Sequence, residues 1–191
     1  MIKRIEYPFT EEKVRALRVG DAVALSGRIF TGRDRLHQEL ADGTASPVGL
    51  RDGAMYHCGP VVMKEGDGWV VRAAGPTTSM RQDPFMPRII TNLGVRVIIG
   101  KGGMGEATRA ACRENGCVYL QAVGGAAALL AASIERVEGV HFLQEFGPTE
   151  AMWELVVRDF SAVVTMDTRG RSLHRTIERN TRKNLKMLLE G

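Results

Sequence analysis

The sequence lacks the features that mark several large classes of protein. No apolar run approaches the roughly 18 residues needed to span a membrane, so we expect no membrane contact. The first thirty residues contain no continuous apolar segment, which predicts the absence of a signal peptide and a cytoplasmic location. Only three cysteines are present, an odd number without a paired framework, as in proteins of reducing compartments.

Recognisable catalytic constellations are also missing. No Ser-His-Asp set, pair of carboxylates or cluster with metal-ligand spacing stands out, so we expect no metal site in this chain. A lone histidine is more often a satisfied surface or core residue than a ligand. The four histidines are scattered along the chain at His37, His57, His141 and His174.

The composition that is present is that of a globular domain. A chain of 191 residues fits one domain and can bury about 70% of its unfolded surface. Glycine, at 22 residues, exceeds the usual share of about 7% and indicates tight turns. The net charge is +4, and much of the excess lies in the last twenty or so residues. This charge permits an anionic substrate or an acidic partner without requiring nucleic acid, and we expect none.

Local patterns predict an α/β fold. Thr10 can cap a short helix over 11–18, and residues 21–32, "DAVALSGRIFTG", alternate as a half-buried strand does. From Pro84 the chain alternates helices of ordinary length with apolar strands, which favours parallel pairing through right-handed crossovers. The predicted helices there are 85–93, 105–116 and 124–137, and the predicted strands are 95–100, 117–123 and 139–146.

The last part of the chain departs from this alternation. Residues 152–160, "MWELVVRDF", and 161–168, "SAVVTMDT", predict an antiparallel pair of strands. Residues 171–191 predict a basic helix packed only at its start. The fold class is therefore a single α/β domain with a mixed, partly parallel sheet.

Three polar or glycine-rich segments follow predicted strands, where open α/β sheets place their ligands. They are "TGRD" at 31–34, "GPTTSMR" at 75–81 and "GKGGMG" at 100–105. Each also has an ordinary interpretation, as a turn, a helix N-cap or close packing. "GKGGMG" fits neither the Walker pattern nor the dinucleotide fingerprint, because Gln121 stands where an acidic residue is required.

Taken together, the three segments favour a binding site. Each contributes a cation, namely Arg33, Arg81 and Lys101. Arginine can fork onto a carboxylate and lysine adds a point charge, so a dicarboxylate is a sensible ligand. The residues themselves indicate an anion-binding half-site and no complete catalytic machinery.

Six segments in order carry a resemblance to a known family: "LSGRIFTGRDRLH", "YHCGPVV", "AAGPTTSMRQD", "IGKGGMG", "VYLQAVGGAAALLAASI" and "GPTEAMWELVVRDFSAVVTMDTRG". From about residue 10 to about residue 173 the chain resembles the beta subunit, or C-terminal domain, of the class I iron–sulfur fumarases and tartrate dehydratases. The resemblance implies a swivelling β/β/α domain over 1–173, followed by a basic helical tail over 174–191.

The same resemblance implies a partner and a reaction. The partner is an alpha subunit that carries a [4Fe–4S] cluster, which this chain does not ligate, and we expect a homo-oligomer or a heterotetramer. The reaction is the reversible hydration of fumarate to L-malate. Dehydration of L-tartrate to oxaloacetate is the alternative within the family. A non-catalytic anion- or nucleotide-binding module is the alternative outside it.

Residue roles follow from the positions that match the family's motifs. The resemblance implies that Thr77 is the catalytic base, that Arg81 grips a substrate carboxylate, and that Arg33 and Lys101 complete the substrate-binding pocket. A threonine hydroxyl is a weak base, so this role requires nearby cations to stabilise the developing negative charge. The simpler interpretation of Thr77 is a helix N-cap.

Overall fold

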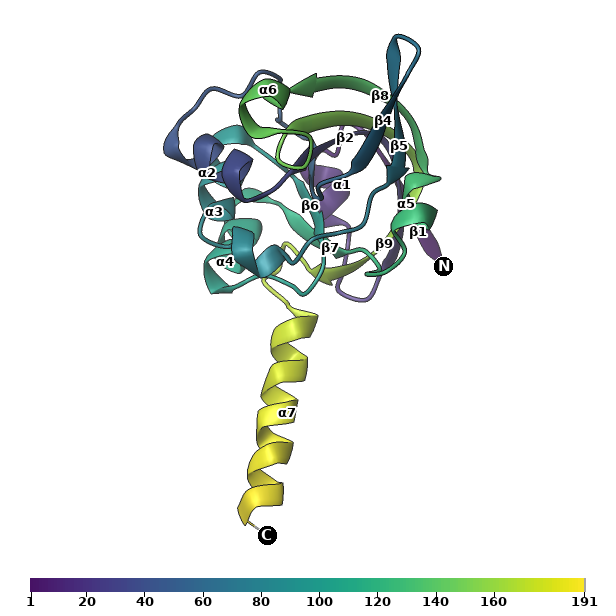
Figure 1. The fold of residues 1–191 in the computed structure, drawn as a ribbon. Helices are drawn as coiled ribbons and strands as arrows, with labels where there is room; N and C mark the ends of the chain where they lie inside the picture. The colour runs from purple at the N-terminus through teal and green to yellow at the C-terminus, as the bar shows by residue number, and fades with distance from the viewer. Residues whose placement is uncertain (191) are drawn as a thin grey trace.

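The computed structural model describes residues 1–190 (Figure 1). Its strands are β1 (Ile2–Glu6), β2 (Ala22–Gly32), β3 (Ala54–His57), β4 (Val61–Glu65), β5 (Gly68–Ala73), β6 (Val97–Gly100), β7 (Val118–Gln121), β8 (Ile134–His141) and β9 (Met152–Met166). Its helices are α1 (Glu11–Arg15), α2 (Asp34–Asp42), the 3₁₀ helix η1 (Ser79–Gln82), α3 (Met86–Leu93), α4 (Glu106–Asn115), α5 (Ala127–Ala131), α6 (Leu143–Phe146) and α7 (Leu173–Glu190).

The main sheet is mixed, as expected, with the order β1-β2-β3-β6-β7-β9-β8. Strands β1, β2, β3, β6 and β7 pair in parallel. The long strand β9 runs antiparallel and pairs with β2 as well as with β7 and β8. Because β9 bonds to both β2 and β7, the strands between them form a closed ring. Strands β4 and β5 form a separate antiparallel hairpin.

Alternation along the strands divides the apolar side chains between two cores. Side chains on one face of the strands, such as those of Tyr56, Ile99 and Leu120, belong to the core inside the ring. Side chains on the opposite face, such as those of Ile98 and Tyr119, pack under a layer made by α2, α3 and α4. These three helices lie side by side on one flank of the sheet (Figure 1). The sheet is therefore held rigidly on both faces.

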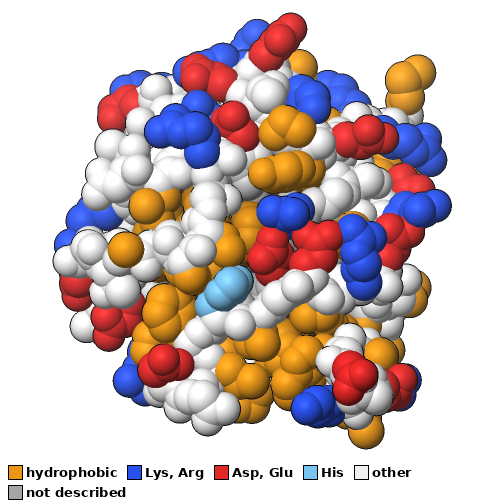
Figure 2. Space-filling model, turned by 90° about the horizontal axis from the view of Figure 1, so that it is seen from above, with side chains coloured by type: hydrophobic (Ala, Val, Ile, Leu, Met, Phe, Trp, Pro, Cys, Tyr) orange, Lys and Arg blue, Asp and Glu red, His pale blue; other side chains and the backbone are white. Residues whose placement is uncertain are grey.

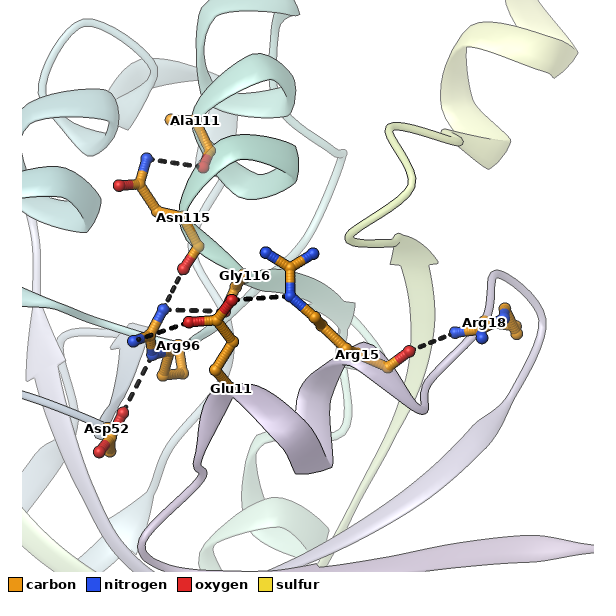
Figure 3. Close-up of polar contacts among 8 residues, drawn as sticks. All are labelled: Glu11, Arg15, Arg18, Asp52, Arg96, Ala111, Asn115 and Gly116. Atoms are coloured by element: carbon orange, nitrogen blue, oxygen red, sulfur yellow. Dashed lines mark hydrogen bonds and ion pairs between the residues drawn. The ribbon is translucent and has the colours of Figure 1, made fainter.

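Arg96 joins three segments at the amino-terminal ends of the parallel strands (Figure 3). Its Nε donates to Asp52 Oδ1 at 3.0 Å, and its Nη2 lies 3.4 Å from Glu11 Oε2. Its Nη1 donates to the carbonyl oxygen of Asn115, at the end of α4. The side chain is only 14% exposed, so this arginine is part of the structure and is not free to bind a ligand.

The structure corrects several predicted elements. The predicted helix over 124–137 is only the short α5, and β8 begins at Ile134 because the long strand β9 offers it an edge for pairing. The predicted strand over 139–146 ends at His141 and gives way to α6. The helix expected over 11–18 spans Glu11–Arg15, and Thr10 forms no side-chain cap. Strand β1 was not predicted.

The predicted antiparallel pair over 152–168 is one continuous strand, β9. Asp159, with a φ of 48°, lies where a turn was expected. A register shift opposite Leu25 and Gly27 of β2 accommodates the irregularity as a bulge, so the chain bends without reversing.

Helix α7 projects away from the body of the molecule (Figure 1). None of its residues is buried, although His174 near its start accepts or donates a hydrogen bond with Thr165 Oγ1 at 3.0 Å. This agrees with the prediction of a basic helix packed only at its start. No helix among residues 1–190 combines the length and the apolar character needed to cross a membrane.

Seen from the end opposite α7, lysine and arginine side chains alternate with aspartate and glutamate (Figure 2). Apolar side chains are visible between them. The face shown therefore carries mixed charge and no continuous basic surface.

Candidate active site

The carboxyl ends of the parallel strands meet at one edge, as their sequences predicted. Gly32 of β2 pairs with His57 of β3, and Gly100 of β6 pairs with Gln121 of β7. Tyr56 pairs with Ile99, which brings the end of β3 beside the end of β6. Arg33 and Lys101 directly follow β2 and β6, so both leave the sheet at this edge.

The segment that begins at Thr77 extends the same edge. The amide of Thr77 donates to the carbonyl oxygen of His57 at 2.7 Å, and the amide of Lys101 donates to the carbonyl oxygen of Thr77 at 3.3 Å. The amide of Ser79 then donates to the carbonyl oxygen of Lys101 at 2.9 Å. Backbone bonds therefore hold Thr77 between the ends of β3 and β6. All three predicted segments converge.

Thr77 does not cap a helix. The N-cap position of η1 is Thr78, and no side-chain cap bond forms there. The Thr77 hydroxyl instead accepts a hydrogen bond from Arg81 Nη2 at 3.3 Å. The N-cap interpretation of Thr77 is therefore wrong, and the hydroxyl lies beside a permanent cation.

The three cations differ in how they are paired. Arg81 Nη2 lies 3.0 Å from Asp34 Oδ2, and the Arg81 side chain is half exposed. Arg33 Nε lies 3.4 Å from Glu150 Oε1 but forms no hydrogen bond, although the nitrogen is buried. Lys101 forms no side-chain hydrogen bond or ion pair with any residue of 1–190. The free ammonium and the incompletely satisfied guanidinium leave donors for an anionic ligand.

A buried hydrogen-bonded cluster supports this edge from below. Ser79 Oγ lies 2.9 Å from His57 Nδ1 and accepts a bond from the Tyr119 hydroxyl at 2.9 Å. The amide of Gly103 donates to the Tyr119 oxygen at 3.3 Å, which ties the "GKGGMG" turn to the cluster. Burial raises the pKa of Tyr119 to about 12 and lowers the pKa of His57 well below its usual range. Both groups are therefore neutral near pH 7.

Gly100 is required by the packing of this cluster. A Cβ added there would overlap Ser79 Oγ and would lie 3.2 Å from both His57 Nδ1 and the Tyr119 hydroxyl. The glycine that ends β6 thus lets the backbone pass directly over three polar side chains.

Two histidines that looked scattered in the sequence lie together. The rings of His37 and His57 are 5.0 Å apart between centroids, and both residues are fully buried. His37 Nδ1 lies 2.7 Å from Gln82 Oε1, one residue beyond Arg81. Periodicity could have shown that His37 lies on the inner face of a helix, one turn after Arg33. Nothing in the sequence indicated its partner.

Asp83 is a further residue that the sequence reasoning missed. Its Oδ1 accepts bonds from the Gly105 amide at 2.7 Å and from Thr108 Oγ1 at 2.6 Å. The carboxylate therefore satisfies the amino-terminal end of α4 from a neighbouring segment, where negative charge is favourable. The segment 77–83 is bonded to β3, β6, α2 and α4 along its length.

The chain is similar to known proteins at the level of a family and of individual sequences. The model described as "Fumarase C-terminus" matches residues 2–177. The chain belongs to this family.

Curated relatives of the fumarase C-terminus family bear two kinds of name. A protein of Geobacillus stearothermophilus named as a class I fumarate hydratase is 51% identical over 187 residues, 97% of this chain. The chain spans only 36% of that relative. A beta subunit named for L(+)-tartrate dehydratase in Methanocaldococcus jannaschii is 39% identical, with 97% of this chain and 99% of the relative covered. The tartrate dehydratase beta subunit of Escherichia coli K12 is 37% identical, with 91% and 87% covered.

This family member offers no ligand set for an iron–sulfur cluster within residues 1–190. No group of three or more His, Cys, Asp or Glu side chains is placed to hold a metal ion there. Cys58, Cys112 and Cys117 are all fully buried. Burial raises the pKa of Cys58 to about 12 and also raises the pKa of Cys117.

Proposed function

We propose that this chain is the beta subunit of a hydro-lyase that hydrates fumarate reversibly to L-malate, together with an alpha subunit carrying a [4Fe–4S] cluster. The observation that carries the proposal is the contact between Arg81 and the Thr77 hydroxyl, on a segment whose backbone is bonded to that of Lys101. Family membership and the 51% identity to a relative named as a class I fumarate hydratase support it.

Thr77 would exchange the proton at carbon 3 of the substrate. A hydroxyl is a weak base, but a cation that donates a hydrogen bond to its oxygen favours the deprotonated form. Arg81 occupies that position at 3.3 Å. In the dehydration direction the deprotonated Thr77 oxygen would take the proton from carbon 3 of L-malate, while the substrate hydroxyl would leave on the side of the partner subunit and receive there the proton that makes it water. In hydration Thr77 would return its proton to carbon 3.

The three cations would hold the two carboxylates. Arg81 makes both its contacts with residues 1–190 through Nη2, which leaves the N–H groups of Nε and Nη1 as donors for a substrate carboxylate. Arg33 and Lys101 would bind carboxylate oxygens and stabilise the charge that develops when the carbon–hydrogen bond breaks.

The cluster would belong to the partner subunit, since residues 1–190 group no three side chains that could hold a metal ion. When bound there, its open iron would supply a Lewis acid for the substrate hydroxyl. The residues of this chain would supply the proton transfer, the carboxylate binding and the exclusion of solvent on the opposite side.

The test is to express the chain with a cluster-bearing alpha subunit from the same genome and to reconstitute the complex without oxygen. We expect hydration of fumarate by the complex and no activity from this chain alone. Turnover of L-tartrate with no turnover of fumarate would show that the substrate is wrong and the reaction class right.

L-Tartrate dehydration is the second candidate, because two relatives named for that activity are 39% and 37% identical. A non-catalytic binding module is the third. Tight nucleotide binding in calorimetry that is unaffected by Thr77→Val, without any complex with an alpha subunit, would favour the module over both enzymes.

A further inference from the structure

A row of hydrogen bonds leads from the buried core to Arg81, and it begins at His37. His37 Nδ1 lies 2.7 Å from Gln82 Oε1, and both side chains are fully buried. A carbonyl oxygen only accepts, so Nδ1 must carry the proton. His37 Nε2 has no partner and packs against Gly32. Burial lowers the pKa of His37 to about 4, so the ring is neutral at neutral pH.

The second bond connects Gln82 to Asp34. Gln82 Nε2 donates to Asp34 Oδ1 at 2.5 Å. Asp34 fixes the orientation of this amide, because a carboxylate only accepts and therefore faces the NH₂ group, which leaves the carbonyl oxygen of Gln82 for the Nδ1 proton of His37. Rotating the amide by half a turn would place an oxygen against the carboxylate of Asp34 and an NH₂ group against the histidine proton.

The third contact connects Asp34 to Arg81. Asp34 Oδ2 lies 3.0 Å from Arg81 Nη2, the same nitrogen that donates to Thr77 Oγ1. Both carboxylate oxygens of Asp34 are therefore used, one toward the core and one toward the site. A half-exposed arginine would otherwise sample many rotamers, so this anchor limits where the guanidinium lies.

We infer that Asp34, Gln82 and His37 are positioning residues that hold the Arg81 guanidinium beside the Thr77 hydroxyl. They act through Arg81 and touch no substrate themselves. The expected effect on kcat/KM rests on the proposed function, whereas the expected restriction of the Arg81 side chain does not. The alternative role for Asp34 is a favourable charge in the first turn of α2, which would affect stability and leave Arg81 unchanged.

The kinetic test is a double-mutant cycle in the reconstituted complex with the alpha subunit. We expect Asp34→Asn to lower kcat/KM by about 10- to 100-fold, since small displacements of a catalytic group have effects of that size. Its effect should largely disappear in the Arg81→Met background, because both substitutions disable the same guanidinium. Additive effects would overturn the inference.

Two further variants test the separate contacts that lead from His37 through Gln82 and Asp34 to Arg81. We call this row of contacts the relay. Gln82→Glu keeps an acceptor for His37 but places a carboxylate against Asp34, so it should reduce kcat/KM about as much as Asp34→Asn does. The matched control is Asp42→Asn at the other end of α2, which removes an exposed ion pair with Arg88 at 3.3 Å. The control should leave kcat/KM within about twofold of the wild type. An equal loss in the control would count against the relay.

The structural test uses the isolated chain and requires no activity. Nitrogen NMR with labelled histidine and arginine should show His37 protonated at Nδ1 and restricted rotation of the Arg81 guanidinium. Asp34→Asn should release that rotation, while Asp42→Asn should not. If Arg81 rotates freely in the wild type, or is unaffected by Asp34→Asn, the relay is wrong. If the complex turns over neither fumarate nor tartrate, the proposed function is wrong. The NMR result would still show whether Asp34, Gln82 and His37 hold the Arg81 guanidinium in place.

Discussion

Arg81 Nη2 lies within hydrogen-bonding distance of two oxygens, 3.3 Å from Thr77 Oγ1 and 3.0 Å from Asp34 Oδ2. The same nitrogen thus connects a candidate proton acceptor with a carboxylate that is anchored in the core. This arrangement supports the proposed role of Thr77 in proton transfer, and it leads to the following predictions.

Thr77→Val should lower kcat of the reconstituted complex by about 100-fold or more, the usual size of a general-base contribution. The free energy of unfolding of the chain should change by less than about 1 kcal/mol, because the hydroxyl caps no helix. Thr77→Ser, which keeps the hydroxyl, is the control and should retain most of the rate. Near-normal turnover by the valine variant would remove Thr77 from the mechanism.

Two arginines should respond to the same substitution in opposite ways. Arg81→Met should raise KM and lower kcat with little effect on unfolding, because the side chain is half exposed. Arg96→Met should lower the free energy of unfolding by roughly 2–4 kcal/mol, since it strands a carboxylate and backbone carbonyls. Its KM should stay unchanged. Chemical denaturation and steady-state kinetics on both variants would check this, and a KM effect at Arg96 would contradict the assignment of the site to the opposite edge.

The buried histidines should make stability depend on pH. The pKa of His37 falls from its usual 6.5 to about 4 on folding, so the unfolded chain binds a proton that the folded chain refuses between these values. Stability is therefore full above pH 6.5 and is lost as the pH falls toward 4. From about pH 7 to about pH 5 the loss due to His37 should be about 2 kcal/mol.

His57, whose pKa is also lowered by burial, adds to this loss. Urea unfolding of the wild type and of His37→Gln at both pH values measures the difference. An identical pH dependence in the two proteins would show that His37 is not buried neutral.

Gly100→Ala should damage both folding and function. The added methyl would overlap Ser79 Oγ and crowd His57 and Tyr119, at a cost of about 1–3 kcal/mol typical of overpacking. Because Lys101 follows directly, its ammonium should also be displaced and KM should rise. Adding Ser79→Ala removes the oxygen that is overlapped and should recover part of the unfolding free energy. No recovery would mean that the strain lies elsewhere.

Deleting the chain after Thr176 should leave the free energy of unfolding within about 0.5 kcal/mol of the full-length value, since α7 buries no residue. Deletion after Ser172 also removes His174, which bonds Thr165 and packs against Gly103. This longer deletion should lower stability measurably. Thermal unfolding of both truncations would distinguish a tail held at His174 from one held along its length.

The sequence predicted what depends on local pattern. Apolar alternation and glycine-rich strand ends were enough to place Arg33, Arg81 and Lys101 at one edge of a partly parallel sheet. The single strand β9 was not predictable, because a bulge at Asp159 imitates a turn in the sequence. The short α5 was not predictable either, because pairing with β9 overrides the helix propensity after Ser133.

The relay behind Arg81 lay beyond sequence reasoning for a different reason. His37 and Asp34 meet Gln82 across 45 and 48 residues of chain. No spacing rule links positions so far apart, and a buried glutamine has no characteristic pattern. The roles of Thr77, Arg33, Arg81 and Lys101 in catalysis and substrate binding stay predictions until the variants are measured.

The many bonds along 77–83 bear on how substrate would enter. That segment is tied to β3, β6, α2 and α4 by backbone and side-chain hydrogen bonds. The amides of Thr77 and Ser79, which donate to the carbonyl oxygens of His57 and Lys101, should exchange with solvent more slowly than those of a mobile active-site loop. A flap over the substrate cannot be made from such a segment. In the proposed complex, we therefore expect the site to open by relative movement of this domain and its partner, and not by a flap made from 77–83.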